Sequence, residues 1–478
     1  MVIILPSNAN AASQFCDDVI THTKTSTFQS RQHEYLPITT LHELVSDSNV
    51  QRVLKNDDQI RALESSEREN FLSHITTFAP RMYALAVFTG FPLVKLKDLL
   101  CKHGLTDKDL PLTPGDCKEV AHRPEFERCL IDSGHQSLFS APEFRVGVYD
   151  QIVHSSFPIP IDTHKKLGGG LQGTVYEAWV EHGHLEIPKK THYYEERIVA
   201  VKEIFEQSDF KTERDFLLAM RGVEHDHMAK PYAGFEYNGT HYLISEVADQ
   251  NLEDFMERNP HGRGSMQTQP GFRWLVRQMR RLAGALKRIH NPGEGKTGFH
   301  HDIKLQNLLV FTSKNTHGRI CIADWGTAVV SKNPVSDGGS HPSNRRGIPE
   351  HIPPSVLGEL IPPEAIAIGR PPTSRPHDIW SLGCVFLELL VWFCRGDAYR
   401  VQIFRNERAR QHGSLAYFHN AAGNARLKAV EDEIQYLRTS HNTPGWTVLM
   451  DTVEHMLHPV AEQRPSSIEL NRALVSYR

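Results

Sequence analysis

The stretch that decides the fold is HHDIKLQN, residues 300–307, followed by IADWG, residues 322–326. Within it, Asn307 lies five residues after Asp302, and Asp324 lies seventeen residues after Asn307. A carboxylate at Asp302 can accept the proton of an attacking hydroxyl. The side-chain oxygens of Asn307 and Asp324 are hard ligands, which suit Mg²⁺ better than nitrogen or sulfur does. Lys304 has the charge to neutralise a phosphoryl group during transfer. The pattern therefore predicts phosphate chemistry.

A glycine-rich stretch, LGGGLQGTVY at residues 167–176, precedes this constellation. It follows the spacing G-x-G-x-x-G-x-V, with its fixed positions at Gly168, Gly170, Gly173 and Val175. Glycines at these points allow a tight turn whose backbone N–H groups can lie on phosphate oxygens. A glycine-rich hairpin without a ligand is the alternative. A dinucleotide-binding fold would need a helix after the glycines, but the residues after Gly173 have a strand pattern. We expect a hairpin loop that closes over phosphates.

A lysine follows at the end of an apolar strand, in the sequence Val199-Ala200-Val201-Lys202. Its position downstream of the glycine-rich loop predicts that Lys202 pairs with phosphate rather than with solvent. A buried ammonium needs a carboxylate beside it, because an unpaired buried charge is costly. Glu213, in the helical stretch FKTERDFLLAM, is the candidate for this role. Asp209 and Asp215 remain alternatives.

Composition excludes several classes of protein. The 478 residues carry a formal charge of −4, which argues against the basic surface of a nucleic-acid binder. The hydrophobic share of 39% is ordinary for a folded chain. Seven scattered cysteines form no C-x-x-C pair, which favours a reducing compartment. The N-terminal residues lack the basic start of a signal peptide, and no apolar stretch predicts a membrane span. We expect an intracellular protein, in the cytoplasm or the nucleus, that binds neither membrane nor nucleic acid.

The pattern along the chain predicts four segments. Residues 1–56 are polar and are expected to be loosely ordered. Residues 57–110 have helical apolar spacing and are expected to form a small helical subdomain, and 111–160 are expected to be a connector. From about residue 161 short strands alternate with turns, and from Phe272 onward helices dominate. A small β-rich part before a large helical part predicts two lobes, so the fold class is α+β.

From Ile161 to the C-terminus, residues 161–475, the chain resembles the eukaryotic-type protein kinases. The matching motifs occur in the family's order. They are the glycine-rich loop, V-A-V-K, H-x-D-I-K-x-x-N, D-W-G in place of the usual D-F-G, Pro362-Pro363-Glu364, Asp378-Ile379-Trp380-Ser381-Leu382-Gly383 and Gln463-Arg464-Pro465. The resemblance implies a two-lobed kinase fold and transfer of the γ-phosphoryl group of Mg-ATP to a serine or threonine hydroxyl of a protein. The N-terminal part, with Leu105-Thr106-Asp107 and Leu110-Pro111-Leu112, resembles the leader of a poorly described fungal kinase group.

The resemblance also implies a role for each site residue. The catalytic residues would be Asp302, Lys304, Lys202 and Glu213. The residues around ATP would be Leu167, Gly168, Gly170, Gly173, Val175, Ala200, Lys202, Ser245, Glu246, Ala248 and Leu309. Asn307 and Asp324 would bind Mg²⁺. Glu364 and Arg464 would form an ion pair that braces the C-lobe, and Asp378 would hold the 300–307 loop.

One departure from the family bears on regulation. His301 stands where the family usually has an arginine that binds a phosphate on the activation segment. We therefore expect activity that does not depend on phosphorylation of that segment. Two other functions compete with an active protein kinase: a pseudokinase that serves as a nucleotide-binding or scaffolding module, and a small-molecule phosphotransferase. Intact Lys202, Asp302 and Asp324 argue against the first, and the Pro-Pro-Glu motif argues against the second.

Overall fold

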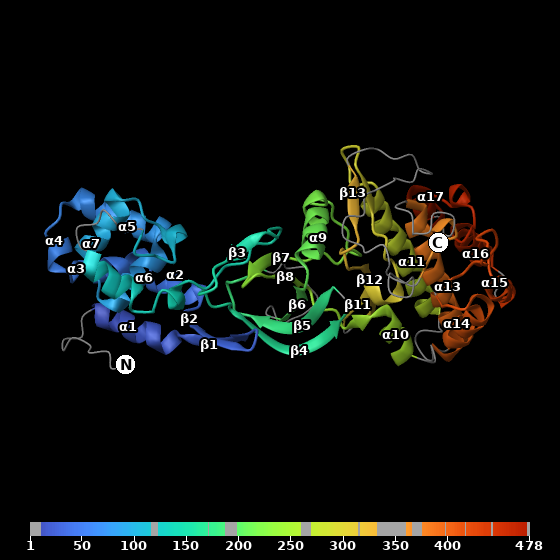
Figure 1. The fold of residues 1–478 in the computed structure, drawn as a ribbon, viewed down its shortest axis with the longest axis horizontal. Helices are drawn as coiled ribbons and strands as arrows, with labels where there is room; N and C mark the ends of the chain where they lie inside the picture. Colours follow the sequence, from blue (N-terminus) through green and yellow to red (C-terminus); the bar gives the residue numbers. More distant parts are fainter. Residues whose placement is uncertain are drawn as a thin grey trace. The chain divides into compact units, whose positions relative to one another are not determined.

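The computed structural model describes most of the chain, in the ranges 11–115, 123–170, 172–186, 198–259, 269–313, 316–331, 360–365, 375–396, 398–415, 417–440 and 443–475. The chain divides into two compact units (Figure 1). Unit 1 comprises residues 1–203 and 232–244, and unit 2 comprises residues 204–231 and 245–478.

The first part of unit 1 is helical. Its α-helices are α1 (Ala11–His22), α2 (Ile38–Leu44), α3 (Asp47–Lys55), α4 (Asp58–Arg61), α5 (Ser65–Phe78), α6 (Pro80–Thr89), α7 (Leu93–Lys97) and α8 (Arg123–Phe126). Short π-helical or 3₁₀ turns cover Asp98–Lys102, Asp107–Asp109, Glu127–Ile131 and Ser137–Phe139. Pro80 at the first position of α6 and Gly90, in the left-handed conformation after it, fix where that helix begins and ends.

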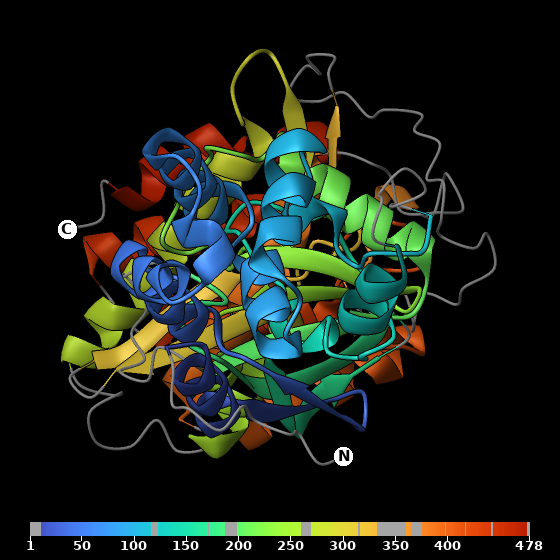
Figure 2. The same cartoon turned by 90° about the vertical axis from the view of Figure 1, so that its left-hand side faces the viewer.

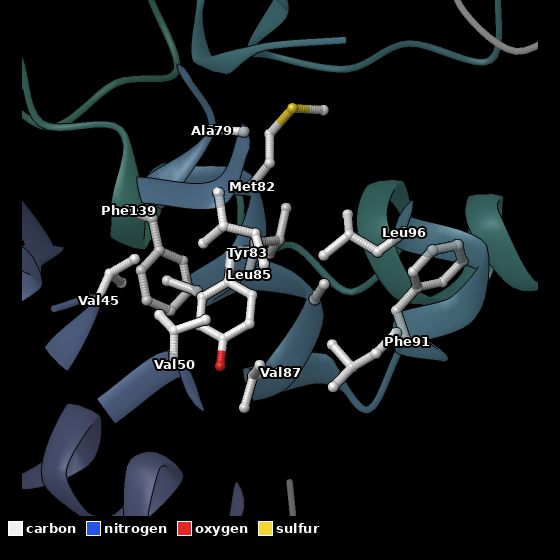
Figure 3. Close-up of a cluster of buried hydrophobic side chains, with 14 of the residues drawn as sticks. Val45, Val50, Ala79, Met82, Tyr83, Leu85, Val87, Phe91, Leu96 and Phe139 are labelled. Atoms are coloured by element: carbon white, nitrogen blue, oxygen red, sulfur yellow. The ribbon is translucent and has the colours of Figure 1, made fainter. Parts of the chain in front are cut away.

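Helix α6 lies at the centre of this helical part. Every residue from Met82 to Val87 is buried, so the helix is covered on all sides rather than along one stripe. Figure 3 shows Tyr83 and Leu85 among the side chains of Val45 and Phe139, which come from segments before and after α6. The apolar core of the helical part thus draws on the chain from residue 11 to residue 139.

The second part of unit 1 is a six-stranded sheet in the order β3-β7-β8-β6-β5-β4. The strands are β3 (Gln151–Val153), β4 (Ile161–Gly169), β5 (Gly173–Val180), β6 (Ile198–Ile204), β7 (Ala233–Tyr237) and β8 (Thr240–Ser245). β4 pairs with β5, and β7 with β8, in antiparallel register, whereas β3 adds to the edge of β7 in parallel register. The expectation of short strands from about residue 161 onward is confirmed by β4, β5 and β6.

A separate hairpin packs against this sheet. Its strands are β1 (Lys24–Phe28) and β2 (Arg31–Tyr35), and both ribbon views show it beside β4 (Figures 1 and 2). The ring of Phe28 is 1% exposed and lies 5.0 Å from the ring of Tyr242 and 6.0 Å from that of Phe235. Buried Ser26 donates its hydroxyl to the Ile159 oxygen at 2.6 Å. The hairpin therefore contributes to the apolar core of the sheet.

His184 joins the helical part of unit 1 to the sheet. Its side chain is buried, its Nδ1–H donates to the Pro142 oxygen at 2.7 Å, and its Nε2 accepts from the Ile38 N–H at 3.0 Å. Burial lowers the pKa of His184 to about 4, so the ring is neutral at neutral pH and can accept at Nε2. The helical part and the sheet are thus bonded into one folded unit.

Unit 2 is mainly helical, with two small sheets. Its helices are α9 (Gln207–Ala219), α10 (Leu252–Arg258), α11 (Gln269–His290), α13 (Arg375–Arg395), α14 (Ala398–His412), α15 (Lys428–Ser440), α16 (Pro444–Met456) and α17 (Ser467–Val475). One sheet has the order β12-β11-β9, with β9 (Gln250–Asn251), β11 (Leu308–Ser313) and β12 (Thr316–Ile322). The other pairs β10 (Thr297–Phe299) with β13 (Val329–Ser331).

Helix α13 is the core of unit 2 and contacts α14, α15 and α16. It is long and apolar enough to cross a membrane, and it alone passes that test among the described residues. Its most apolar window is 94% buried within the fold, which is typical of the core helix of a folded domain.

The predicted α+β class, with a β-rich part before a helical part, is confirmed. The N-terminal segment differs from expectation. Residues 11–56, expected to be loosely ordered, form α1, the β1–β2 hairpin, α2 and α3, and they supply buried side chains such as Phe15, Phe28 and Val50. Within 111–160, expected to be a connector, Phe126 and Leu130 join the helical core and β3 extends the sheet.

Candidate functional site

The glycine-rich stretch forms the turn between β4 and β5, as the sequence predicts. Gly168 lies opposite Val175 in the ladder, and the Gly170 N–H donates to the Gly173 oxygen at 2.9 Å. A Cβ added at Gly168 or Gly170 would meet nothing within 4 Å, and neither residue has a left-handed backbone. Leu167, just before them, is 40% exposed. Neither packing nor conformation requires glycine here, which fits a loop that a ligand approaches closely.

Strand β6 presents alternate residues to its two faces. Val199 and Val201 are fully buried in the core that contains Phe28. Ala200 and Lys202 alternate with them and so belong to the opposite face of the sheet. Ala200 is buried, whereas Lys202 is partly exposed. The strand thus separates its core-forming residues from the two residues assigned to the ATP site.

Glu213 lies in the middle of α9 and is 3% exposed. Of the two alternatives, Asp209 is partly exposed, and Asp215 is exposed and pairs with its neighbour Arg214 at 2.8 Å. Burial therefore favours Glu213, because a buried carboxylate needs a partner. Lys202 belongs to unit 1 and Glu213 to unit 2, and their pairing stays a prediction.

Three of the residues predicted to lie around ATP are at the end of β8 and just after it. Ser245 is the last residue of that strand and is partly exposed. The side chain of Glu246 is occupied, since its Oε2 accepts from Arg319 Nη2 at 3.0 Å. The other carboxylate oxygen, Glu246 Oε1, is buried without a hydrogen-bond partner among the described residues, and Ala248 is partly exposed.

Strand β11 anchors the segment that follows β8. The Asp249 N–H donates to the Val310 oxygen at 3.0 Å. Leu309, which is also predicted to lie around ATP, is between Asn251 of β9 and Cys321 of β12 in the three-stranded sheet. The sheet thus fixes the position of Leu309 relative to the segment after β8.

Three of the predicted catalytic and metal-binding residues converge in the 300–307 loop. Asn307 Nδ2 donates to Asp302 Oδ2 at 2.8 Å and to the Asp302 backbone oxygen at 2.9 Å. Lys304 Nζ lies 2.9 Å from the same Oδ2. Both side chains hold Asp302 by Oδ2, which leaves Oδ1 for another donor. Because Asn307 directs its amide nitrogen toward Asp302, its Oδ1 is the atom available to a cation.

Asp324 is brought to this loop by the pairing of β11 with β12. Leu308 lies opposite Ile322, and the Ala323 N–H donates to the Asn307 oxygen at 3.0 Å. The chain then turns at Asp324, which has a left-handed backbone with φ of 65°. The ladder thus places Asn307, just before β11, close to Asp324, two residues after the end of β12.

Asp378 of α13 supports the loop from beneath and is fully buried. Its Oδ2 accepts from the His300 N–H and from His290 Nε2, both at 2.9 Å, and its Oδ1 accepts from the His301 N–H at 2.8 Å. Burial alone would raise the pKa of Asp378, but the hydrogen bond and charge of His290 hold it well below its usual range. The predicted role of Asp378 is confirmed.

Trp325 packs tightly behind Asp324. Its ring is 1% exposed and stacks on Phe216 of α9, with ring centroids 5.1 Å apart. The ring of His300 meets Trp325 edge-on at 5.2 Å. The indole N–H donates to the Ala229 oxygen at 3.0 Å, a bond that a phenylalanine at this position could not make.

The predicted ion pair between Glu364 and Arg464 is also confirmed. Arg464 Nη2 and Nη1 lie 2.7 and 2.9 Å from the two carboxylate oxygens of Glu364, in a bidentate arrangement. The same guanidinium donates to the backbone oxygens of Pro376 and His458. Arg464 therefore links the start of α13 to the segment before α17.

The structure brings together Asp302, Lys304 and Asn307, with Asp324 beside them. Sequence reasoning missed His290, which joins the loop support through Asp378. It also missed the indole bond to Ala229. No sequence pattern around His290 indicates its bond to Asp378, because it is one more buried residue near the end of α11. The indole nitrogen of Trp325, in contrast, could have predicted a hydrogen bond to an acceptor, since a buried indole N–H usually has one.

Comparison with known proteins agrees with this geometry. Residues 161–473 match the protein kinase domain family. Cyclin-dependent kinase C-2 of Oryza sativa subsp. japonica is 28% identical over 210 residues, which cover 43% of this chain and 32% of that protein. Serine/threonine-protein kinase Nek5 of Mus musculus is 28% identical over 191 residues, 40% of this chain and 26% of that protein.

A third relative, serine/threonine-protein kinase 40 of Pongo abelii, is 33% identical over 114 residues, 24% of this chain and 22% of that protein. The chain thus spans a third or less of the length of these three curated relatives. The family match covers more than half of this chain and includes the glycine-rich turn and the 300–307 loop. The chain belongs to the protein kinase domain family.

Proposed function

We propose that this chain is an active protein kinase that transfers the γ-phosphoryl group of Mg-ATP to a serine or threonine hydroxyl of a protein. The observation that carries the proposal is the arrangement of Asp302, Lys304 and Asn307. Two donors hold Asp302 by Oδ2, so its Oδ1 is directed by the loop and available to a substrate hydroxyl. A fixed carboxylate within reach of a hydroxyl is what general-base assistance requires.

Each of the proposed site residues has a defined part in the transfer. Asp302 Oδ1 accepts the proton as the hydroxyl oxygen bonds to the γ-phosphorus, and the bond from that phosphorus to the leaving oxygen of ADP breaks. Lys304, whose ammonium already lies at Oδ2, stabilises negative charge on the phosphoryl oxygens. Lys202 and the backbone of the glycine-rich turn position the phosphates.

The donor set fits Mg²⁺. Asn307 Oδ1 and the carboxylate of Asp324 are oxygen ligands on adjoining strand ends, and Mg²⁺ in such enzymes takes only one or two protein ligands besides phosphate oxygens and water. Among the described residues no group of three histidine, cysteine or acidic side chains could hold a metal unaided. A magnesium ion here would thus bind together with ATP and would neutralise charge on the phosphates.

The test is the replacement Asp302→Asn, which keeps the size of the side chain and removes the base. We expect phosphate incorporation from radiolabelled ATP to fall by about 10²–10⁴-fold. ATP affinity, measured by calorimetry, should stay within about threefold of wild type, because the base acts mainly in the transition state. The matched control is Asp432→Asn on α15, where the carboxylate is 64% exposed and pairs with Lys428.

The outcomes separate the competing functions. ATP binding without protein phosphorylation in the wild type would favour the pseudokinase, a nucleotide-binding module. Phosphorylation of small molecules but not of proteins would favour the small-molecule phosphotransferase. Equal turnover by wild type and Asp302→Asn would remove Asp302 from the mechanism.

A further inference from the structure

A small pocket lies beside the 300–307 loop of unit 2. Lys304, which pairs with Asp302 at 2.9 Å, forms one wall, and Val385 and Glu388 of α13 form another. Arg405 and Arg408 of α14 close it. The pocket has a volume of about 30 Å³, which limits an occupant to a small group. Because the Lys304 side chain both lines the pocket and contacts Asp302, the pocket lies within one side-chain length of that carboxylate.

The carboxylate in the pocket is already fully paired. Arg405 contacts both oxygens of Glu388, through Nε at 3.2 Å and Nη2 at 2.7 Å. Arg408 Nη2 donates to Glu388 Oε1 at 2.6 Å. Burial alone would raise the pKa of Glu388, but the two arginines keep it lowered, so the group is ionised at neutral pH. An arginine or lysine of a substrate would find no unpaired anion here and would meet three cations of the chain.

The cations, in contrast, have donors to spare. A guanidinium has five N–H groups, and the bonds of Arg405 to described residues, Glu388 and Glu253, use Nε, one N–H of Nη1 and one of Nη2. Lys304 uses one of its three N–H groups on Asp302. Both side chains are reachable, with exposures of 17% for Arg405 and 22% for Lys304. Two cations that can still donate face a space the size of a carboxylate.

One lining residue has an unsatisfied acceptor. Gln306 lines the pocket and donates its amide nitrogen to Glu253. Its Oε1 is buried and has no donor within the part of the chain that the structure describes. A buried acceptor without a donor is costly, so a side-chain rotation that turns Oε1 toward a peptide N–H in the pocket would be favourable.

We propose that this pocket is a substrate subsite that selects an acidic side chain close to the accepting hydroxyl and rejects a basic one. The proposal rests on the protein kinase function proposed above. An extended chain advances about 3.3 Å per residue, so the selected residue lies within about three positions of the serine or threonine. Arg405 determines the selection, since it neutralises Glu388 and also supplies the free N–H groups.

The experiment compares peptides that share one sequence around a central serine and differ at one flanking position, which carries Asp, Ala or Arg. Two variants, Arg405→Ala and Arg405→Gln, are compared with wild type. Arg408 still pairs with Glu388 in both, so the buried carboxylate keeps a partner, and melting curves identify any unfolded variant. The control is Arg410→Ala on the same helix, where the side chain is 74% exposed and pairs with Glu407.

Two readouts are taken for each peptide. The first is kcat/KM for phosphoryl transfer, and the second is the Kd of a fluorescent version in which alanine replaces the serine. For wild type and Arg410→Ala we expect the Asp peptide to exceed the Ala peptide by about tenfold at the best position, and the Arg peptide to be poorest. In Arg405→Ala and Arg405→Gln the Asp preference should fall to about one, and the Arg peptide should gain.

The binding readout separates the two proposals. Selective binding of the Asp peptide without phosphoryl transfer to any peptide would support the subsite and refute the kinase activity. Transfer with equal use of the Asp, Ala and Arg peptides, or a wild-type preference for Arg, would refute the subsite and leave the activity standing. An Asp preference that survives in a folded Arg405→Ala protein would also refute it, because the selecting group would lie elsewhere.

Discussion

The buried carboxylate that holds the 300–307 loop gives the sharpest prediction. Asp378 accepts three hydrogen bonds, two at Oδ2 and one at Oδ1, and none of its side-chain surface is exposed. The change Asp378→Asn keeps the shape but replaces one acceptor oxygen with an NH₂ group. In its best orientation the amide oxygen still serves His290 and the His300 N–H, and the NH₂ group then faces the N–H of His301.

The magnitude follows from these three bonds. Loss of a hydrogen bond to a charged acceptor costs about 1.5–3 kcal/mol, and conversion of the other two from a charged to a neutral acceptor costs about 1 kcal/mol each. The sum is about 4 kcal/mol, within the range measured for breaking buried charge pairs. For a unit of this size the melting temperature should fall by about 10 °C. Displacement of the loop that carries Asp302 should also reduce kcat by about tenfold to hundredfold.

The effect has a defined pH dependence. The folded-state pKa of Asp378 is depressed, so the stability it contributes is complete above the unfolded-state pKa of about 3.9 and is lost as the pH falls through the folded-state value. Below about pH 3.9 the stability difference between wild type and Asp378→Asn should shrink by up to about 1.4 kcal/mol per pH unit.

Urea unfolding at neutral pH and at a series of acidic pH values measures both quantities, with Asp432→Asn as the exposed control. A loss of less than about 1 kcal/mol at neutral pH would refute the reasoning, because three buried bonds cannot be weakened at so low a cost. A stability difference that grows on acidification would refute the sign of the pKa shift.

Two further predictions concern residues in which this chain departs from its family. Trp325→Phe removes the hydrogen bond to Ala229 and part of the ring stacked on Phe216. The free energy of unfolding, measured in urea, should therefore fall by about 1–3 kcal/mol. For the control Trp179→Phe, where the side chain is exposed, it should fall by less than about 0.5 kcal/mol. His301 is 7% exposed and stacks on Phe299, so its ring is not presented to a phosphate on the surface. Phosphatase-treated and untreated enzyme should therefore have the same initial rate of phosphoryl transfer. A rate that falls by more than about tenfold after phosphatase treatment would contradict this prediction.

Much of the site was predictable because its chemistry is compressed into short stretches. Asp302, Lys304 and Asn307 lie within six residues, so their side chains converge once the loop forms. The pattern of short strands expected from about residue 161 includes β5 and β6, and thus the surroundings of the glycine-rich turn. The pairing of Glu364 with Arg464, one hundred residues apart, was predictable only through the family resemblance, since no local pattern carries so distant a contact.

The remaining contacts lack a local signal. The turn between β1 and β2 is made by Gln29 and Ser30, both with positive φ, where the usual sequence is Asn-Gly or Asp-Gly. Because neither residue favours that conformation, the sequence gives no indication of a hairpin there. Helix α3 does show the apolar spacing Val50, Val53 and Leu54, but one such stretch in a polar segment is weak evidence against loose order.

Contacts made by residues before Ile161 show that the folded unit begins earlier in the chain than the family match does. The match begins at Ile161, the first residue of β4, but the sheet also contains β3 from before that point, and Phe28 and Phe144 supply part of its core. The ring of Phe144 lies 4.7 Å from that of Phe235, a residue in the middle of the sheet. Apolar surface of this kind cannot be left in water without loss of stability, so residues before Ile161 are part of what makes the sheet fold. The sheet carries the glycine-rich turn and Lys202, so the segments around Phe28 and Phe144 support these two features through the stability of the sheet.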